Sequence, residues 1–286
     1  MSTLLALDVG GTKLAAASAA LNDDGWAATA RAETPATGGE ALAELIRLAS
    51  MVAGDTVAGI GVSFGGHVEA RTGAVRRSIH VPGWDDVPLG EVLRERFGAP
   101  VRIANDGNAG ALGEWDAAGR PAGPVCYVTV STGVGGGIVL DGEILVGADG
   151  FAAELGHIVV KPGGTLCSCG RRGCVETVAS GPAIAQRAGT ATAQEAAERG
   201  DAAARNAFAD AAHALAVAVS ALIAIVNPCL VAIGGGVTAA GPLLWDPLRA
   251  ELDAAAWPDV TTEVRLARSP DAPLAGARVL AERAAP

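Results

Sequence analysis

The sequence predicts an α/β protein of two domains, and three observations lead to this prediction. Its 286 residues are enough for two domains of ordinary size, each with its own core. Continuous apolar runs, such as 57–62 and 101–104, are typical of buried strands and alternate with runs of helical spacing. A strand–glycine turn–strand unit also occurs twice, about 120 residues apart, which suggests two halves built on one plan.

The first glycine turn follows an apolar strand that ends at Asp8. Gly10 and Gly11 reverse the chain, and Thr12 and Lys13 then lead into a second strand. A Gly-Gly turn beside a hydroxyl and an ammonium group can present backbone N–H donors to a phosphate. An ordinary hairpin turn has the same sequence, so both interpretations stay open.

The rest of the first domain contains a second candidate for ligand binding. We expect a strand at 27–33, a helix at 40–52, the buried strand at 57–62, a helix at 89–97 and the buried strand at 101–104. The strand at 57–62 ends in the loop Ser-Phe-Gly-Gly-His at 63–67. Open α/β sheets bind ligands at the carboxyl ends of their strands, which makes this loop a candidate.

The tetrapeptide Asn-Asp-Gly-Asn at 105–108 follows the last of these strands. Asn, Asp and Gly are common turn and N-cap residues, so Asp106 could cap a helix at 109–118. Alternatively, a carboxylate at a strand–helix junction is placed to act as a general base. We put the domain boundary here, with domains at 1–105 and 106–270 and a C-terminal helix at 271–286 as a candidate to complete the first.

The second glycine turn lies in the segment 125–145, which repeats the strand–turn–strand pattern. Ser131 and Thr132 stand at this turn and Gly133 follows them. Neither glycine turn is a Walker A motif or a dinucleotide fingerprint, because a strand rather than a helix follows each.

The remainder of the chain is mostly helical. We expect helices at 182–187, 193–199, 201–226, 242–254 and 275–283, and strands at 229–233 and 262–267. The glycines at 234–236 follow the first of these strands. They would let a nucleotide lie close to the backbone, and tight packing explains them nearly as well.

The stretch 154–180 holds three of the five cysteines, Cys167, Cys169 and Cys174, with His157 ten positions before the first. Three thiols and one imidazole match the Cys3His set of a closed structural zinc site, and the glycines between them allow tight turns. The alternative is a pair of buried thiols and a surface loop. A disulfide is disfavoured because nothing else in the chain indicates an oxidising compartment.

Composition restricts the partners of the protein. Its net charge of −10 argues against a nucleic-acid-binding surface. The apolar run at 4–7 lacks the basic flank and the length of a signal peptide. The run at 214–226 is shorter than the roughly 20 residues that cross a bilayer, so we expect a buried helix. Cys126 and Cys229 are expected to be small core residues. The sequence thus predicts a cytoplasmic protein with no membrane or nucleic-acid partner.

Taken in order, the motifs resemble those of the ROK family of sugar kinases, and most closely its bacterial glucokinases. The motifs are DVGGTK at 8–13, NDGNAGALGE at 105–114, STGVGGG at 131–137, ELGH at 154–157, CSCGRRGCVE at 167–176 and IGGG at 233–236. They extend along nearly the whole chain, and the cysteine motif is the most specific of them.

The resemblance implies an actin-like, hexokinase-type ATPase fold with an interdomain cleft and a zinc loop at 157–174. It implies ATP and a hexose as substrates, Mg²⁺ and structural Zn²⁺, a role in glycolysis, and a homodimer or homotetramer. Asp106 would take the proton from the attacking 6-hydroxyl. The residues implied for the sugar are Gly66, Asn105, Asp106, Glu154, His157 and Glu176; for ATP, Asp8, Gly10, Gly11, Thr12, Lys13, Ser131, Thr132, Gly133, Gly235 and Gly236; for zinc, His157, Cys167, Cys169 and Cys174.

The sugar is less clear than the reaction. Many glucokinases of the family have Pro-Gly where this chain has Gly65-Gly66 followed by His67, which resembles its N-acetylmannosamine kinases. We expect glucose, with N-acetylmannosamine or N-acetylglucosamine as the alternative. The family also contains sugar-sensing repressors, but here the first glycine turn leaves no room for a preceding DNA-binding domain. A zinc-stabilised adaptor would need a basic face.

Overall fold

The computed structural model describes residues 2–21, 25–69, 72–78, 81–269 and 271–286, and it divides into two compact units. The first unit contains Met1–Arg120, Ile144–Ala152 and Ser269–Pro286, and the second contains Pro121–Glu143 and Ala153–Arg268. The first unit therefore continues 15 residues beyond the predicted boundary at 105, and the C-terminal segment belongs to it.

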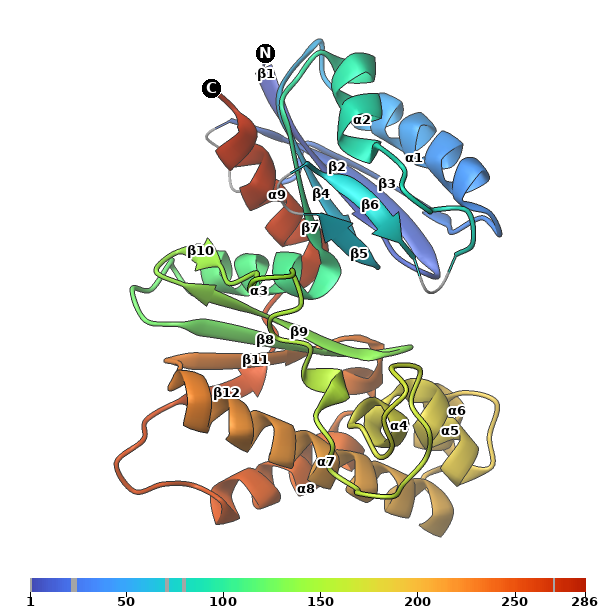
Figure 1. Ribbon diagram of the computed structural model, residues 1–286, viewed down its shortest axis with the longest axis vertical. Coiled ribbons are helices and arrows are strands. Elements are labelled where there is room, and N and C mark those ends of the chain that lie inside the picture. The colour runs from blue at the N-terminus through green and yellow to red at the C-terminus, as the bar shows by residue number, and fades with distance from the viewer. Residues whose placement is uncertain (1, 22–24, 70–71, 79–80, 270) are drawn as a thin grey trace. The chain divides into compact units, whose positions relative to one another are not determined.

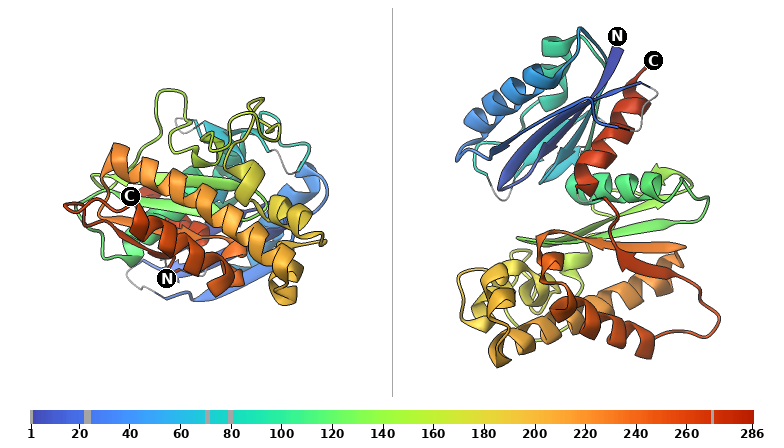
Figure 2. Two further views of the ribbon diagram at one scale, coloured as in Figure 1. Left: turned by 90° about the horizontal axis from the view of Figure 1, so that it is seen from below. Right: turned by 180° about the vertical axis from the view of Figure 1, so that it is seen from behind.

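The first unit is a five-stranded sheet between helices. Across the sheet the strands are β3 (Ala28–Glu33), β2 (Lys13–Ala20), β1 (Ser2–Val9), β4 (Thr56–Phe64) and β7 (Val101–Asn105), with β5 (His67–Glu69) and β6 (Ala74–Arg77) as a separate hairpin. Its helices are α1 (Gly38–Val52), α2 (Leu89–Phe97), α3 (Asp106–Ala117) and α9 (Ala272–Ala284). Helices α1 and α2 cover one face of the sheet and α9 covers the other (Figures 1 and 2).

Glycines explain why α9 and α3 belong to the first unit. A Cβ atom at Gly61 of β4 would lie 1.8 Å from the carbonyl oxygen of Ala277 in α9. A Cβ atom at Gly276 of α9 would lie 1.7 Å from the carbonyl oxygen of Ala109 in α3. Because only glycine allows such close backbone approach, α9 packs directly on both elements and joins α3 to the sheet.

The second unit repeats the strand arrangement of the first. Its strands are β10 (Glu143–Ile144), β9 (Val134–Leu140), β8 (Val125–Val130), β11 (Leu230–Gly234) and β12 (Glu263–Leu266), in their order across the sheet. In both sheets the central strand pairs antiparallel with the next strand in the chain and parallel with a later one. The prediction of two halves built on one plan is confirmed.

Helices make up the rest of the second unit. They are the short 3₁₀ helices η1 (Leu155–His157) and η2 (Gly236–Ala240) and the α-helices α4 (Glu176–Ala179), α5 (Gly181–Ala188), α6 (Ala193–Arg199), α7 (Ala202–Val226) and α8 (Pro242–Ala254). Helices α7 and α8 pack together on one face of the sheet (Figures 1 and 2).

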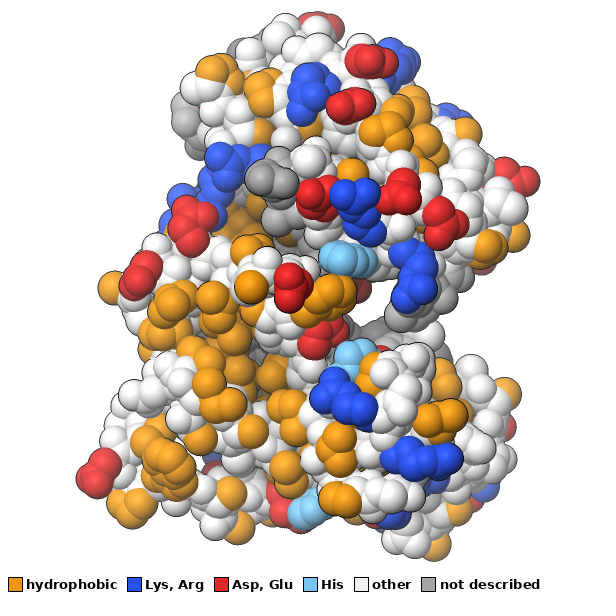
Figure 3. Space-filling model, viewed as in Figure 1, with side chains coloured by type: hydrophobic (Ala, Val, Ile, Leu, Met, Phe, Trp, Pro, Cys, Tyr) orange, Lys and Arg blue, Asp and Glu red, His pale blue; other side chains and the backbone are white. Residues whose placement is uncertain are grey.

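Helix α7 confirms the buried helix predicted from the run at 214–226 but not the argument made from the length of that run. The helix has 25 residues and is long and apolar enough to cross a membrane, so the length argument was wrong. This is weak evidence for a membrane span, because core helices of soluble proteins pass the same test. Phe208, Leu215 and Val219 of α7 are fully buried within the second unit. The face of this unit seen in Figure 3 mixes hydrophobic, charged and polar side chains.

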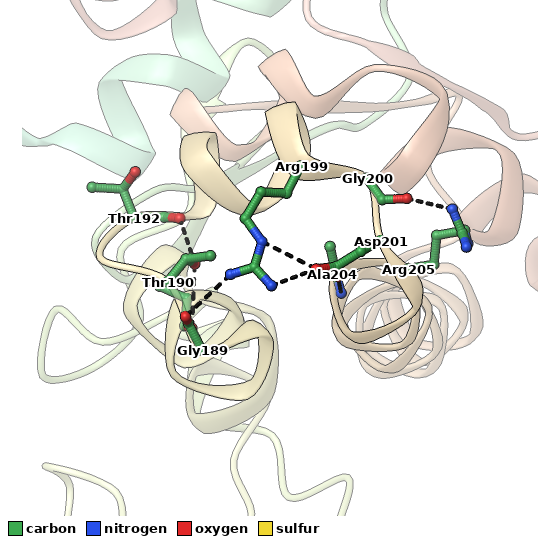
Figure 4. Close-up of polar contacts among 9 residues, drawn as sticks. Gly189, Thr190, Thr192, Arg199, Gly200, Asp201, Ala204 and Arg205 are labelled. Carbon is green, nitrogen blue, oxygen red and sulfur yellow. Dashed lines mark hydrogen bonds and ion pairs between the residues drawn. The ribbon is translucent and has the colours of Figure 1, made fainter.

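Polar contacts fix the ends of α5, α6 and α7 against one another (Figure 4). Arg199, at the end of α6, bonds to the carboxylate of Asp201 and to the carbonyl oxygen of Gly189, which ends α5. The other oxygen of Asp201 accepts a hydrogen bond of 2.9 Å from the backbone N–H of Ala204 and caps α7. One arginine thus joins the ends of three helices.

Candidate functional site

In the first unit, three strand ends meet at one edge of the sheet. Strands β1, β4 and β7 run parallel, and in their register Asp8 is paired with Ser63 and Phe64 with Asn105. The first glycine turn, the loop 63–67 and the Asn-Asp-Gly-Asn segment therefore leave the sheet at the same edge, as expected for a ligand site of an open α/β sheet.

Asp8 is a buried carboxylate at this edge. It is 4% exposed, and the hydroxyl of Ser63 donates a 2.7 Å hydrogen bond to its Oδ1 atom. Burial raises the pKa of Asp8 to about 7, against the opposing effect of the Ser63 hydrogen bond. The nearby carboxylates of Asp271 and Asp106 also raise this pKa, and Lys13 lowers it. A nearby cation would stabilise the ionised form of this buried carboxylate. Asp8 therefore suits a hard, oxygen-binding ion such as Mg²⁺.

We expect Asp8→Asn to stabilise the ligand-free protein increasingly as the pH rises from 5 to 8. The folded-state pKa of about 7 exceeds the ordinary value of 3.8, so in this window the folded protein binds more protons than the unfolded chain. Its free energy of unfolding then falls with rising pH, by at most about 4 kcal/mol in total. Asparagine cannot ionise and still accepts from Ser63. Urea unfolding at several pH values measures the difference, with exposed Asp85→Asn as control. A pH-independent difference would contradict the raised pKa.

The loop 63–67 is held rigidly by backbone contacts. The N–H of Gly65 donates to the carbonyl oxygen of Val9 at 2.8 Å. The side-chain amide of Asn105 donates to the carbonyl oxygen of Gly66 at 3.1 Å. A Cβ atom at Gly66 would lie 2.5 Å from the carbonyl oxygen of Arg77. Gly66 is therefore required by close packing, whatever ligand the loop binds.

The N-cap of α3 is Asn105, and the interpretation of Asp106 as the cap is wrong. The Asn105 Oδ1 atom accepts a hydrogen bond of 2.9 Å from the N–H of Gly107, while Asp106 is the first residue of the helix. The Asp106 carboxylate also accepts from Gly107 through Oδ1, and its Oδ2 atom lies 3.8 Å from the position of a Cβ atom at Gly65. Its half-buried carboxylate thus faces the glycine loop.

The first glycine turn is a hairpin turn closed by a 3.0 Å hydrogen bond from the N–H of Gly10 to the carbonyl oxygen of Lys13. Gly11, Thr12 and Lys13 are exposed. The Lys13 ammonium group lies 3.1 Å from the carboxylate of Asp271, which also pairs with Arg31 at 3.0 Å. The ammonium group of Lys13 therefore forms an ion pair with Asp271.

In the second unit, the second glycine turn lies beside the glycines that follow β11. Gly235 has a φ of 94°, and a Cβ atom there would lie 2.4 Å from the carbonyl oxygen of Val130. A Cβ atom at Gly236 would lie 3.7 Å from the Ser131 hydroxyl. Glycine at 235 lets the chain pass the end of β8, and this places 235–236 against 131–133. Both the packing and the ligand interpretation remain compatible with this arrangement.

The cysteine stretch forms a four-residue cluster. The ligand atoms of His157, Cys167, Cys169 and Cys174 lie within 4.8 Å of one another. The Cys167 sulfur is 3.5 Å from Nδ1 of His157, and the Cys169 and Cys174 sulfurs are 3.7 Å apart. Tetrahedral Zn²⁺, with Zn–S of about 2.3 Å and Zn–N of about 2.0 Å, would separate its ligands by about 3.5–3.8 Å. The cluster fits zinc, and all the cysteines are free of disulfides.

The thiols of the cluster differ in acidity. A hydrogen bond from the backbone N–H of Arg171 lowers the pKa of Cys169 to about 6, which favours the thiolate that binds metal. Burial raises the pKa of Cys174 to about 12, and a metal ion bound to the thiolate would offset this effect. Outside the cluster, Cys126 is buried as predicted, whereas Cys229 is exposed and that prediction is wrong.

The two carboxylates beside the cluster occupy different positions. Glu154 precedes η1, and its carbonyl oxygen accepts from the N–H of His157 at 3.1 Å. Because His157 directs Nδ1 at the cluster, its Nε2 remains for another partner. Glu176 begins α4, and its Oε2 atom accepts a 3.1 Å hydrogen bond from the N–H of Val134, just after the second glycine turn.

Sequence reasoning missed two contributors to these sites. Ser63 bonds to Asp8, and only the register of β1 against β4 reveals this pairing. The N–H of Gly181 donates to the carbonyl oxygen of Ser131 at 2.7 Å, a contact with no local sequence signal.

A cavity of about 380 Å³ lies between α7, α8 and β12 in the second unit. All of the predicted site residues are among the described residues, and none of them lines this cavity.

A family model described as ROK family matches residues 4–284. The chain belongs to the ROK family. Its relatives include a glucokinase of Thermotoga maritima, 40% identical over 66% of this chain and 67% of that protein, and an N-acetylmannosamine kinase of Yersinia pseudotuberculosis, 38% identical over 82% of both. A ROK glucokinase of Streptomyces griseus, solved in complex with glucose and AMPPNP, is 28% identical with a TM-score of 0.81 over 98% of this chain and 99% of that one. The predicted α/β, hexokinase-type ROK fold is confirmed.

Proposed function

We propose that this ROK protein is an ATP-dependent kinase that transfers the γ-phosphoryl group to the 6-hydroxyl of a hexose, with glucose as its favoured substrate. The observation that carries the proposal is the Asp106 carboxylate, held at the ligand edge of the first sheet against the glycine loop. The likeness to named glucokinases supports this reaction.

Asp106 acts as the general base in this proposal. The sugar oxygen forms a bond to the γ-phosphorus, the bond from that phosphorus to the bridging oxygen of ADP breaks, and the hydroxyl proton passes to the Asp106 carboxylate. The proton is lost late in such a transfer, so a carboxylate of ordinary basicity suffices. Positioning and neutralisation of charge supply most of the catalysis.

The other proposed sugar ligands come from sequence motifs of both units. Asn105 holds Gly66 through its side-chain amide and keeps further hydrogen-bonding capacity for a hydroxyl. His157 would offer Nε2 while Nδ1 binds zinc, and Glu154 and Glu176 would accept from hydroxyls.

Backbone donors at the two glycine turns are proposed to bind the ATP phosphates. The turns are formed by Gly10, Gly11, Thr12 and Lys13 and by Ser131, Thr132 and Gly133, and Gly235 and Gly236 would lie against the nucleoside. Asp8 would hold Mg²⁺, which supplies positive charge to the phosphates. His157 and the three clustered cysteines would hold one structural Zn²⁺, which orients His157.

N-acetylmannosamine is the second candidate substrate. His67 follows Gly66 as in the N-acetylmannosamine kinases that the sequence resembles, and its ring lies 4.5 Å from that of Phe151, with the ring centroids as reference. The 38% identity to a named N-acetylmannosamine kinase supports this alternative. Glucose is the favoured sugar because the named glucokinases have the higher identity, 40% against 38%, and because a similar ROK glucokinase was solved in complex with glucose.

A panel of hexoses and N-acetylhexosamines in an ADP-release assay tests both proposals. We expect glucose to give the highest kcat/KM, because the named glucokinases have the higher sequence identity, 40% against 38%. A higher value for N-acetylmannosamine would assign the enzyme to the alternative. If no sugar stimulates ADP release while ATP binds, the kinase proposal is wrong.

We also propose a cytoplasmic, carbohydrate-metabolising enzyme that assembles as a homodimer or homotetramer, as the family resemblance implies. The acidic net charge of −10 supports the absence of a nucleic-acid partner. Analytical ultracentrifugation of the purified protein tests the assembly, and a monomer at micromolar concentration would contradict it.

A further inference from the structure

The second glycine turn is held at both ends by one short segment, 176–181. At the start of the segment, Oε2 of Glu176 accepts a 3.1 Å hydrogen bond from the N–H of Val134. At its end, the N–H of Gly181 donates a 2.7 Å hydrogen bond to the carbonyl oxygen of Ser131. The turn lies between these two contacts, so its backbone follows the position of the segment.

The same segment is continuous with the cysteine cluster. Cys174 precedes Glu176 by two residues, and the N–H of Val175 between them donates to the carbonyl oxygen of Ile158 at 2.9 Å. The Cys167 sulfur lies 4.0 Å from Oε1 of Glu176. The hydroxyl of Thr177 donates to the carbonyl oxygen of Cys174 at 2.7 Å. These contacts join the start of α4 to the cluster on several sides.

The carboxylate of Glu176 also packs directly against the second glycine turn. A Cβ atom at Gly133 would lie 2.7 Å from Oε2 of Glu176, so the carboxylate occupies the space directly over the turn. Val134 is 4% exposed, and its N–H donates to a charged acceptor within this packed region. Hydrogen bonds to charged acceptors are shorter and stronger than neutral ones, and a buried N–H that loses its acceptor is destabilised.

We infer that Glu176 is a positioning residue for the nucleotide-binding turn, and that the Cys3His cluster thereby controls nucleotide affinity as well as the sugar side of the site. This inference rests on the proposed function only in naming the turn as a nucleotide site. This role is compatible with the sugar contact proposed for Glu176. The Oε2 atom accepts from the turn, whereas the Oε1 atom makes no hydrogen bond to the turn.

Two substitutions at Glu176 separate this role from sugar binding. Glu176→Ala removes the acceptor, and we expect the Val134 amide to exchange its hydrogen at least about tenfold faster and AMPPNP, in the absence of sugar, to bind about tenfold more weakly. Glu176→Gln keeps a neutral acceptor, and we expect both quantities to stay within about threefold of the wild-type values. Hydrogen exchange and calorimetry measure them.

Glu195→Ala is the matched control. The Glu195 carboxylate also accepts from a backbone N–H, that of Ala191 at 2.9 Å, but at the start of α6. Its loss should leave the exchange of Val134 and the affinity for AMPPNP unchanged. If Glu176→Ala also leaves both unchanged, or alters only the KM for the sugar, Glu176 does not position the turn and the inference is wrong.

Removal of the metal tests the second half of the inference. Cys169→Ser alters the exposed member of the cluster, and we expect faster exchange at Val134 and weaker AMPPNP binding together with loss of bound zinc. Exchange in α7 shows whether the unit is still folded. A folded, zinc-free protein with wild-type exchange at Val134 would overturn the link. Because exchange requires no substrate, this result is independent of whether the protein is a sugar kinase.

Discussion

Asp106→Ala is expected to reduce kcat for phosphoryl transfer by about 10²–10⁴-fold, the usual contribution of a general base. The carboxylate is half-buried against the Gly65 loop at the carboxyl edge of the first sheet, where the attacking hydroxyl is proposed to bind. Because Asn105 rather than Asp106 caps α3, the helix keeps its cap and the fold should survive. Steady-state kinetics with glucose and ATP measure the loss.

Asp106→Asn is the control that separates basicity from geometry. Its amide oxygen can still accept from the N–H of Gly107, as Oδ1 of Asp106 does at 2.9 Å, but it cannot take a proton at neutral pH. We expect it to be nearly as inactive as the alanine variant while glucose binds within about threefold of the wild-type affinity. Turnover within about tenfold of wild type in either variant would contradict the assignment of Asp106 as the base.

The regular elements of this fold could be predicted because their residues carry local signals. The helices at 89–97, 193–199 and 242–254 have the predicted bounds, since apolar spacing and a glycine, proline or N-cap threonine beside the helix mark their ends. The repeated glycine turns indicated two similar sheets, and both sheets have the same strand order. A pattern that recurs in one chain is a stronger signal than any single turn.

Contacts between distant segments could not be predicted from local signals. The position of α9 against Gly61 and Ala109 depends on close backbone approach, which a glycine in the sequence permits but does not specify. The pairing of Lys13 with Asp271 joins residues 258 positions apart. The same limit applies to Glu176. Its place after a cysteine motif suggested a ligand, but its bond to Val134 appears only when α4 is placed beside the turn.

The cap of α3 shows how a correct signal can be assigned to the wrong residue. Both Asn and Asp are preferred N-caps, and they are adjacent at 105 and 106. Strand β7 ends at Asn105, which is in register with Phe64, and α3 begins at the next residue, Asp106. If Asp106 were the N-cap, the helix would begin one residue later, at Gly107. The correction matters for function, because Asn105 supplies the cap and the cap therefore does not by itself explain a carboxylate at position 106.

Cys174→Ser is expected to abolish zinc binding and to lower the melting temperature by roughly 10 °C or more. Purified wild-type protein should contain about one zinc per chain that resists mild chelation, because four protein ligands close the site. Binding energies of structural zinc sites amount to roughly 10–16 kcal/mol and are coupled to folding, and about 1 kcal/mol shifts the melting of a domain of this size by several degrees. Cys174 is fully buried, so the loop at 157–174 cannot substitute another ligand there.

Cys229→Ser is the control for the loss of a thiol, because Cys229 is an exposed cysteine of the second unit outside the cluster. Elemental analysis and calorimetry of both variants give the zinc content and the melting temperature. The carbonyl oxygen of Gly173 accepts hydrogen bonds from the N–H groups of Val160 and Lys161, at 2.9 and 3.0 Å, so backbone contacts alone already hold one side of the loop. Wild-type protein that is free of metal and fully active would show that these backbone bonds suffice to order the loop, and that the four ligand atoms converge for a reason other than zinc.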